Sequence, residues 1–300
     1  MAVKIVTDST ATLTPEQIKE NELTICTLFI VQDGVSEPEV DLDYHDFYAR
    51  LENVEDLPTT SQPTTANFVE QFERILNDGD DVLGIFISGG LSGTMDGALT
   101  AKGMIEEKNP DYQGRIALVD SQSCSMTLTY PVLEAAKLAQ TGASLEECRE
   151  AAQFTTDSTR FIFAPKSLEH LARGGRIGRA SALLGGVLKL VPLLGPDKND
   201  GTVHTYAKVR TFPKALNTIL EKMLDDAEET GGLKALCVHY ITEQEEAQSF
   251  LKDVVQPAIA KRYPDVTPSF AAISPAIGTH VGPAVGIAYC CAGPVSKEKV

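Results

Sequence analysis

Short apolar runs rich in β-branched residues alternate with longer stretches of helical spacing along the first 140 residues. The apolar runs predict strands at residues 3–7, 24–31, 82–87 and 115–119. The spacing between them predicts helices at residues 43–51, 64–77, 94–108 and 127–140. A further helix is expected to begin at Thr14, with Pro15 in its first turn and Gln17 completing a capping box. The alternation of strand and helix predicts α/β architecture with a parallel sheet.

The second part of the chain keeps this alternation and adds an antiparallel signal. We expect helices at residues 145–157, 180–194, 213–230 and 243–263, strands at 160–164, 234–240 and 269–274, and a last helix or strand at 283–291. Residues 202–211 follow a turn and alternate like an exposed antiparallel strand. No linker separates the two parts, so we expect two domains, residues 1–155 and 156–300, that share a large interface.

The composition is that of an ordinary globular protein, but the charge is strongly acidic. Hydrophobic residues occupy 43% of the 300 positions, which excludes a disordered, collagen-like or coiled-coil chain. Lysine and arginine total 26 and aspartate and glutamate 42, and the formal net charge is −16. A surface of this sign repels nucleic-acid phosphates and anionic membranes, so we expect neither as a partner.

The sequence predicts a cytoplasmic protein with reduced thiols. The longest stretch without a charged side chain, residues 266–295, is interrupted by four prolines and does not predict a membrane helix. The N-terminus leads directly into a strand pattern and lacks the layout of a signal peptide. The six cysteines are scattered without a Cys-x-x-Cys pair, which favours buried packing over disulfides or redox chemistry.

Three hydroxyl-rich loops follow predicted strands, at residues 8–10, 88–94 and 120–123. Ligands of parallel α/β proteins bind beyond the carboxyl ends of the strands, so these loops are expected to converge on one crevice. The first and third loops are equally well explained as helix caps. Residues 88–94 combine three glycines, two serines and a helix N-terminus, and we expect this loop to bind an anionic oxygen.

The known catalytic fingerprints are incomplete in this chain. There is no P-loop, and the glycines of residues 89–93 do not have the dinucleotide-binding spacing. Residues 90–94 miss the nucleophile-elbow pattern at the last position only, so a serine hydrolase built on Ser92 and His280 stays open as an alternative. The histidines lack metal-ligand spacing, and we expect no metal and no cofactor.

Three further segments have side chains suited to binding. Residues 57–65 form a polar loop with five hydroxyls, and residues 278–283 place His280 in a rigid loop among apolar neighbours. Residues 171–179 place three arginines on a glycine-rich loop of an otherwise acidic protein. Each segment also has a purely structural explanation, as a solvated loop, a core histidine or a solvated charge run, but the arginines fit an anion contact or a partner surface.

Taken together, these segments resemble the DegV family of bacterial fatty-acid-binding proteins, the lipid-carrying subunits of fatty acid kinase. Seven pieces carry the resemblance in the family's order, at residues 5–10, 60–63, 87–94, 119–121, 174–177, 208–211 and 278–283. The resemblance implies a DegV-like fold of two α/β domains, the first with a parallel sheet in three layers and the second with a mixed or antiparallel sheet. One long-chain fatty acid would be buried between the domains, in a tunnel that residues 180–194 could line unless they are domain core.

The resemblance also implies the residues that bind the ligand. The carboxylate would be bound by Thr60, Ser61, Ser92, Gly93 and His280, whereas Arg176 and Arg210 would contact the head group or a partner. The protein would then have no catalytic residue, and it would present the carboxylate to a separate ATP-dependent kinase that forms the acyl phosphate. Burial of roughly 14 methylenes at about 0.8 kcal/mol each agrees with a lipid carrier. Two further alternatives stay open: a stand-alone enzyme similar to dihydroxyacetone kinase, and a lipid-sensing regulator without a kinase.

Overall fold

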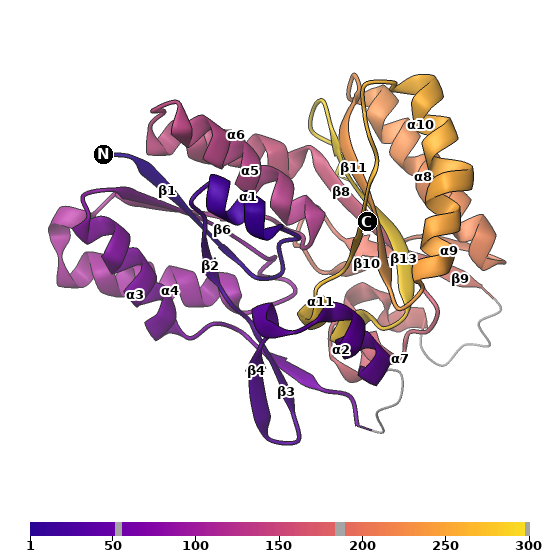
Figure 1. The fold of residues 1–300 in the computed structure, drawn as a ribbon, viewed down its shortest axis with the longest axis horizontal. Helices are drawn as coiled ribbons and strands as arrows, with labels where there is room; N and C mark the ends of the chain where they lie inside the picture. Colours follow the sequence, from indigo (N-terminus) through magenta and orange to yellow (C-terminus); the bar gives the residue numbers. More distant parts are fainter. Residues whose placement is uncertain (52–55, 184–189, 298–300) are drawn as a thin grey trace.

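The computed structural model describes residues 1–51, 56–183 and 190–297, and within them the chain forms three β-sheets (Figure 1). The first sheet is parallel with the order β2-β1-β6-β7, and its strands are β1 (Val3–Asp8), β2 (Thr24–Cys26), β6 (Asp81–Phe86) and β7 (Ile116–Asp120). Helices α3 (Thr65–Asn77) and α4 (Thr94–Lys108) cover one face. Helices α5 (Met126–Gln140) and α6 (Leu145–Asp157) cover the other face, so this part has three layers.

The continuously apolar sequence of the central strand β6 is explained by burial on both faces of the sheet. Leu83 and Ile85 pack in the cluster under α5 and α6, whereas Val82 and Phe86 pack in the cluster under α3 and α4. A strand with helices on both faces buries every side chain, and alternation of polar and apolar residues disappears. The short helix α1 (Pro15–Glu20) begins at the capping box predicted at Thr14.

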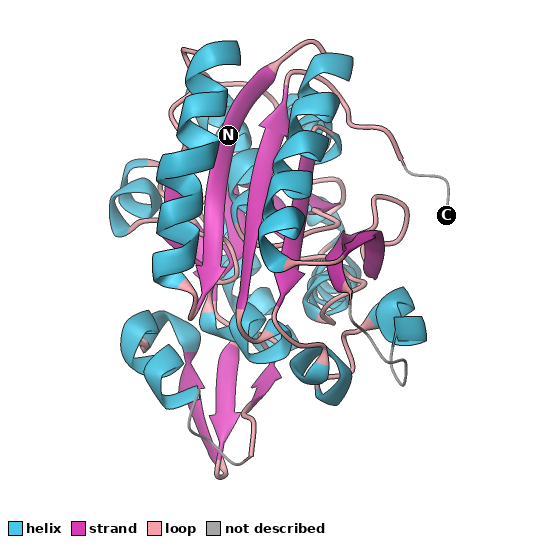
Figure 2. Cartoon of the chain, turned by 90° about the vertical axis from the view of Figure 1, so that its right-hand side faces the viewer, coloured by secondary structure: helices cyan, strands magenta, loops and turns pink. Residues whose placement is uncertain are grey.

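The second sheet is mixed, with the order β10-β9-β8-β13-β11-β12. Its strands are β8 (Thr159–Pro165), β9 (Val191–Pro196), β10 (Val203–Val209), β11 (Leu233–Ile241), β12 (Ser269–Ala272) and β13 (Ala284–Cys291). Strands β11 and β12 pair in parallel and the other neighbours pair antiparallel. Figure 2 shows helices lying across the outward face of this sheet; they are α8 (Phe212–Glu229), α9 (Gln244–Phe250) and α10 (Gln256–Arg262), the last two joined by a π-helical turn (Leu251–Val255).

A small antiparallel sheet with the order β4-β3-β5 projects beside the two large ones. It contains β3 (Phe29–Gln32), β4 (Val35–Pro38) and β5 (Thr59–Ser61), and helix α2 (Tyr44–Leu51) lies between β4 and β5 in the chain. Two short helices of the second half lie in this region: α11 (Pro275–Val281) contacts α2, and α7 (Glu169–Arg173) contacts α11 (Figure 1). The 3₁₀ turns are Glu39–Asp41, Pro110–Tyr112 and Gly178–Leu183.

The predicted α/β class and the mixed second sheet are confirmed, but four local predictions were wrong. Residues 24–31 do not form one strand: the chain leaves the parallel sheet after β2, where the Leu28 N–H donates to Ser9 Oγ at 2.8 Å, and continues in the small sheet. The polar loop of residues 57–65 contains β5, and the loop expected around His280 is helical. Residues 180–194 are not one helix, because β9 starts at Val191 and pairs with β8 and β10; residues 184–189 lie outside the described part.

The change from one large sheet to the other falls between Asp120 and Thr159, and α5 and α6 lie in that interval. One of the buried clusters takes side chains from both halves of the chain, for example Ile87 and Phe161. In the described parts of the chain, no helix combines the length and the apolar composition needed to cross a membrane.

Candidate functional site

An apolar cavity lies between the loop end of the parallel sheet and the inward face of the mixed sheet. It is lined by Leu28, Thr60, Ile87, Leu91, Ser92 and Cys124 from the first half, and by Phe161, Phe163, Leu171, Arg176, Pro196, Val203, Ala276, Ile277, His280 and Val281 from the second. Its empty volume is about 600 Å³ with the mouth included, but the centre of a water molecule has only about 50 Å³ in which to move. The cavity, which we call the apolar cavity, is therefore large enough for a small molecule but narrow.

The three loops converge as predicted, but only the central one brings polar groups to the cavity. The Asp8 carboxylate accepts a hydrogen bond from the Ile87 N–H at 2.7 Å, and the Asp120 carboxylate accepts one from the Gly89 N–H at 3.1 Å. The carboxylates that end β1 and β7 thus brace the loop between β6 and α4 from either side. Ser92 of that loop lines the apolar cavity.

Some backbone N–H groups of this loop, which we expected to bind an anionic oxygen, donate hydrogen bonds within the protein instead. The Gly89 N–H donates to the Asp120 carboxylate, and the Gly90 N–H donates to Ser88 Oγ at 3.0 Å. The Ser88 hydroxyl in turn donates to the Gly201 carbonyl oxygen at 3.0 Å, which ties the loop to the turn between β9 and β10. Gly201 has φ +67°, and a Cβ there would lie 1.9 Å from Ser88 Oγ, so this approach requires glycine.

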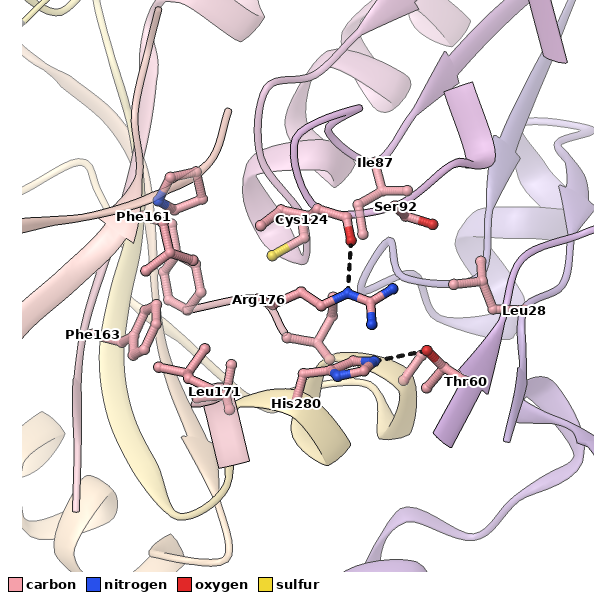
Figure 3. A pocket seen from close by; sticks show the side chains of 16 residues that line it. Leu28, Thr60, Ile87, Ser92, Cys124, Phe161, Phe163, Leu171, Arg176 and His280 are labelled. Atoms are coloured by element: carbon pink, nitrogen blue, oxygen red, sulfur yellow. Dashed lines mark hydrogen bonds between the residues drawn. The ribbon is translucent and has the colours of Figure 1, made fainter. Parts of the chain in front are cut away.

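Four polar side chains gather at one end of the apolar cavity, opposite Phe161 and Phe163 (Figure 3). Thr60 Oγ1 and His280 Nε2 are 2.7 Å apart, although the two residues are 220 positions apart in the chain. The Arg176 guanidinium lies between them and the Ser92 loop, and its Nε–H donates to the Leu91 carbonyl oxygen at 3.4 Å. We call this group of Thr60, Ser92, Arg176 and His280 the polar end.

The electrostatics of the polar end keep His280 neutral. Burial, the positive charge of Arg176 and the neighbouring His170 lower the pKa of His280 to about 4. We assign the ring proton to Nε2, where it is donated to Thr60 Oγ1, because a proton on Nδ1 would be buried without an acceptor. The hydroxyl hydrogen of Thr60 is then free for a ligand. A neutral imidazole, two hydroxyls and one guanidinium are suited to binding a single negative charge.

The remaining predicted site residues lie outside the lining of the apolar cavity. Ser61 is exposed on β5, where alternation along the strand turns it away from the face that carries Thr60. Gly93 is the N-cap of α4, and its carbonyl oxygen accepts a hydrogen bond from the Gln62 side-chain amide at 2.9 Å. A Cβ on Gly93 would lie 2.2 Å from Gln62 Oε1, so a larger residue there would displace the Gln62 side chain. Arg210 is exposed just after β10.

Two residues that the sequence did not single out hold the helix of His280 in place. The buried Glu39 carboxylate accepts a hydrogen bond from the Ala276 N–H at 2.8 Å, at the start of α11. The Tyr48 hydroxyl donates to the Ile273 carbonyl oxygen at 2.8 Å, and Gly278 packs so closely that a Cβ would lie 2.2 Å from the Tyr48 oxygen. Glu39 stands in an acidic, surface-like stretch of sequence, and no local signal distinguishes it.

Replacing Glu39 by glutamine is expected to stabilise the fold at neutral pH. Burial raises the pKa of Glu39 to about 7, above the usual 4.5 that it regains on unfolding, so wild-type stability falls as the pH rises from about 4.5 to 7. Glutamine keeps the acceptor for Ala276 without the charge. The advantage of Glu39→Gln should be about 3 kcal/mol at pH 8 and nearly vanish at pH 4.5. Denaturant unfolding at both pH values, with the exposed Glu37→Gln as control, measures it; a pH-independent difference would contradict the prediction.

Ser92 and His280 do not form the hydrogen-bonded pair that a serine hydrolase requires. Ser92 Oγ is 2.9 Å from Thr94 Oγ1, whereas His280 Nε2 contacts Thr60, and within the described residues His280 Nδ1 has no hydrogen-bond partner to orient the ring. The Cys124 thiol in the cavity is not an activated nucleophile either, because burial raises its pKa to about 12. One group in the described part of the chain could ligate a metal ion, the exposed Asp43, His45 and Asp46 at the start of α2, which does not line the apolar cavity.

Comparisons with known proteins agree with one another over nearly the whole chain. Residues 2–292 match the family described as "Uncharacterised protein, DegV family". A DegV domain-containing protein of Clostridium perfringens is 39% identical over 290 residues, which cover 96% of this chain and 99% of the relative. The crystal structure of DegV, a fatty acid binding protein from Bacillus subtilis, is similar with a TM-score of 0.83 and 30% identity, covering 97% of this chain and 99% of that one. A stearic acid-binding protein from Eubacterium ventriosum has a TM-score of 0.82 at 26% identity, covering 97% and 98%.

Proposed function

Because this chain belongs to the DegV family, we propose that it binds a long-chain fatty acid, with the hydrocarbon tail in the apolar cavity and the carboxylate at the polar end. The observation that supports this most directly is the shape and polarity of the cavity: it is narrow and apolar, and its donors gather at one end. The solved relatives described as fatty acid and stearic acid binding proteins support the same ligand class.

The contacts of the polar end define how the carboxylate would be held. Ser92 and Thr60 donate from their hydroxyls, and Arg176 supplies the positive charge, while His280 orients Thr60 through the 2.7 Å hydrogen bond. Two donors on opposite walls fix the direction of the carboxylate, so the tail must extend toward Phe161 and Phe163. Each hydrogen bond to a charged carboxylate contributes about 1.5–3 kcal/mol, and burial of the methylenes supplies the rest.

Replacing Ser92 by alanine is expected to weaken binding of palmitic acid about tenfold, because one charge-assisted hydrogen bond is lost. The thermal unfolding temperature should fall by only a few degrees, because Ser92 is partly buried and the variant loses the hydrogen bonds of its hydroxyl to Thr94 at 2.9 and 3.3 Å. Native mass spectrometry followed by denaturation first tests whether the purified protein carries or takes up a fatty acid, and titration then compares the variants, with the exposed Ser36→Ala as control. A chain that takes up no fatty acid would overturn the proposed function, whereas an unchanged affinity of Ser92→Ala would remove only Ser92 from the site.

We further propose that the protein is a non-catalytic subunit, which presents the bound carboxylate to a separate ATP-dependent kinase for acyl phosphate formation. The absence of a nucleotide-binding fingerprint in the sequence and of an activated base beside Ser92 supports this division of labour. Arg210 is exposed on a chain of net charge −16 and is a candidate for the docking contact. Arg176 is better placed for the head group, because it lies inside the cavity lining.

Arg210→Ala is expected to leave fatty acid exchange unchanged and to lower acyl phosphate formation by a fatty acid kinase about tenfold at low salt. A charge at the edge of an interface acts mainly on encounter and orientation, so the defect should shrink as salt rises and screens the wild-type contact. Lys214→Ala, which removes a nearby exposed cation on α8, is the matched control. Loss of fatty acid exchange with normal turnover per bound lipid would contradict the docking role.

A further inference from the structure

A smaller cavity, which we call the distal cavity, adjoins the apolar cavity at Phe161 and Phe163. These two residues, with Ile277 and Val281, line both cavities, and Figure 3 shows the two phenylalanines opposite the polar end. The distal cavity lies between α11 and the inward face of the mixed sheet, where β8, β13 and β11 are neighbours. Its empty volume is about 220 Å³, and the centre of a water molecule has about 10 Å³ in it. The distal cavity therefore has room for one group of hydroxyl size.

The imidazole of His239 lines the distal cavity from β11. In the sheet His239 stands opposite Gly286 of β13, and Gly286 stands opposite Phe163 of β8. A Cβ on Gly286 would lie 2.7 Å from Phe163 Cβ and 3.0 Å from Phe161 Cε2. Because glycine leaves this space open, the Phe161 ring comes within 5.7 Å of the His239 ring, centroid to centroid. An acyl tail that extends past Phe161 would therefore meet the imidazole.

The two ring nitrogens of His239 have different surroundings. Nδ1 is 3.0 Å from the Ala271 carbonyl oxygen, which can only accept a hydrogen bond, so we assign the ring proton to Nδ1. Burial lowers the pKa of His239 to about 4, and the ring is neutral near pH 7. Nε2 then has a lone pair, and this buried atom has no hydrogen-bond partner among the described residues. A buried acceptor without a partner is costly, so Nε2 is suited to a donor that arrives with the ligand.

We propose that the distal cavity recognises a hydroxyl group on the far part of a fatty acid tail, which donates a hydrogen bond to His239 Nε2. The inference rests on the proposed binding of a fatty acid and names hydroxy fatty acids as a substrate class. In a purely apolar cavity a tail hydroxyl would lose its hydrogen bonds to water and regain none, so a hydroxy acid would bind more weakly than the plain acid. The lone pair of His239 Nε2 returns one of these hydrogen bonds.

The test is competition between stearic acid and its hydroxy derivatives for the full chain, measured by mass spectrometry of the bound lipid. The wild type should take up 12-hydroxystearic or 18-hydroxystearic acid at least as readily as stearic acid. His239→Phe should lower the ratio of that hydroxy acid to stearic acid about tenfold, because the hydroxyl is then buried without an acceptor. The ratio for 2-hydroxystearic acid, whose hydroxyl lies beside the carboxylate, should not change.

Two further variants separate recognition of the hydroxyl from packing of the ring. His239→Asn keeps an amide near the position of Nδ1, where it can still donate to the Ala271 carbonyl oxygen, but it has no atom at the position of Nε2. It should therefore lose the preference as His239→Phe does. His239→Gln reaches the position of Nε2 with its amide and should keep part of the preference. His45→Asn is the control, because His45 is exposed and lines neither cavity.

The outcomes distinguish this inference from the proposed function. A chain that takes up none of these acids would overturn the proposed function itself. Uptake of stearic acid with the same ratios in the wild type and in His239→Asn would overturn the hydroxyl site while fatty acid binding stands. The wild type alone also provides a test if the variants fail to fold: rejection of both 12-hydroxystearic and 18-hydroxystearic acid in favour of stearic acid would show that Nε2 does not receive a tail hydroxyl.

Discussion

Replacing Cys124 by tryptophan is expected to reduce the affinity for palmitic acid roughly a hundredfold or more. The Cys124 thiol points into the apolar cavity toward Phe161, and the residue is only 3% exposed, so a larger side chain must occupy the space of the tail (Figure 3). Exclusion of about four methylenes at about 0.8 kcal/mol each removes about 3 kcal/mol of binding free energy. Titration with palmitic acid measures the loss.

Two controls make this result interpretable. Cys124→Ala keeps the cavity open and should retain the affinity, because the thiol has no polar role toward the tail. Cys124→Leu fills the cavity only in part and should shift the preference toward shorter fatty acids, even if the tryptophan variant is unstable. A folded tryptophan variant that binds palmitic acid as tightly as the wild type would place the tail elsewhere.

Arg176→Met should weaken palmitic acid binding by one to two orders of magnitude and raise the pKa of His280. The bound carboxylate loses its one positive partner in a partly buried site, where a charged hydrogen bond is worth about 1.5–3 kcal/mol. The charge of Arg176 disfavours protonation of His280, so its removal raises the pKa of His280 from about 4. Because burial is the largest cause of that shift, the pKa should stay below the usual 6.5.

An NMR titration of the His280 ring in ligand-free protein measures the second effect independently of binding. Arg179→Met is the matched control, since Arg179 pairs with Asp197 at 3.3 Å and does not line the apolar cavity. If Arg176→Met changed the pKa of His280 but not the affinity for palmitic acid, Arg176 would be a neighbour of the site and not a ligand of the carboxylate.

Much of the fold could be predicted because its signals are local. The capping box at Thr14 and the bounds of α4 and α6 follow from side chains within one or two turns of one another. The continuous apolar run of β6 indicated a strand covered on both faces, and the structure confirms it. Convergence of the three loops followed from a general property of parallel sheets, in which all strands end at the same edge.

The wrong predictions share a physical cause, which is competition from distant parts of the chain. Thr60 lies on a strand because β3 pairs with it, and His280 lies on a helix because Glu39 and Tyr48 hold the start of α11. Residues 191–196 form β9 because they pair with the neighbouring strands β8 and β10. None of these partners is near in sequence, so the local pattern of residues 278–283 or 180–194 is compatible with more than one structure.

The sequence by itself determined the α/β class, the strands β1, β6 and β7 with the helices that cover them, and the polar residue types that could meet an anion. Only the tertiary structure decided that Thr60 and His280 share a hydrogen bond, that Ser61 turns away from Thr60, and that Arg176 lines the apolar cavity beside them. The physical reason is that an apolar residue has the same pattern in a sequence whether it packs in the core or lines a cavity. Whether space is left between two packed layers depends on contacts across the whole chain, and that space is what a ligand can fill.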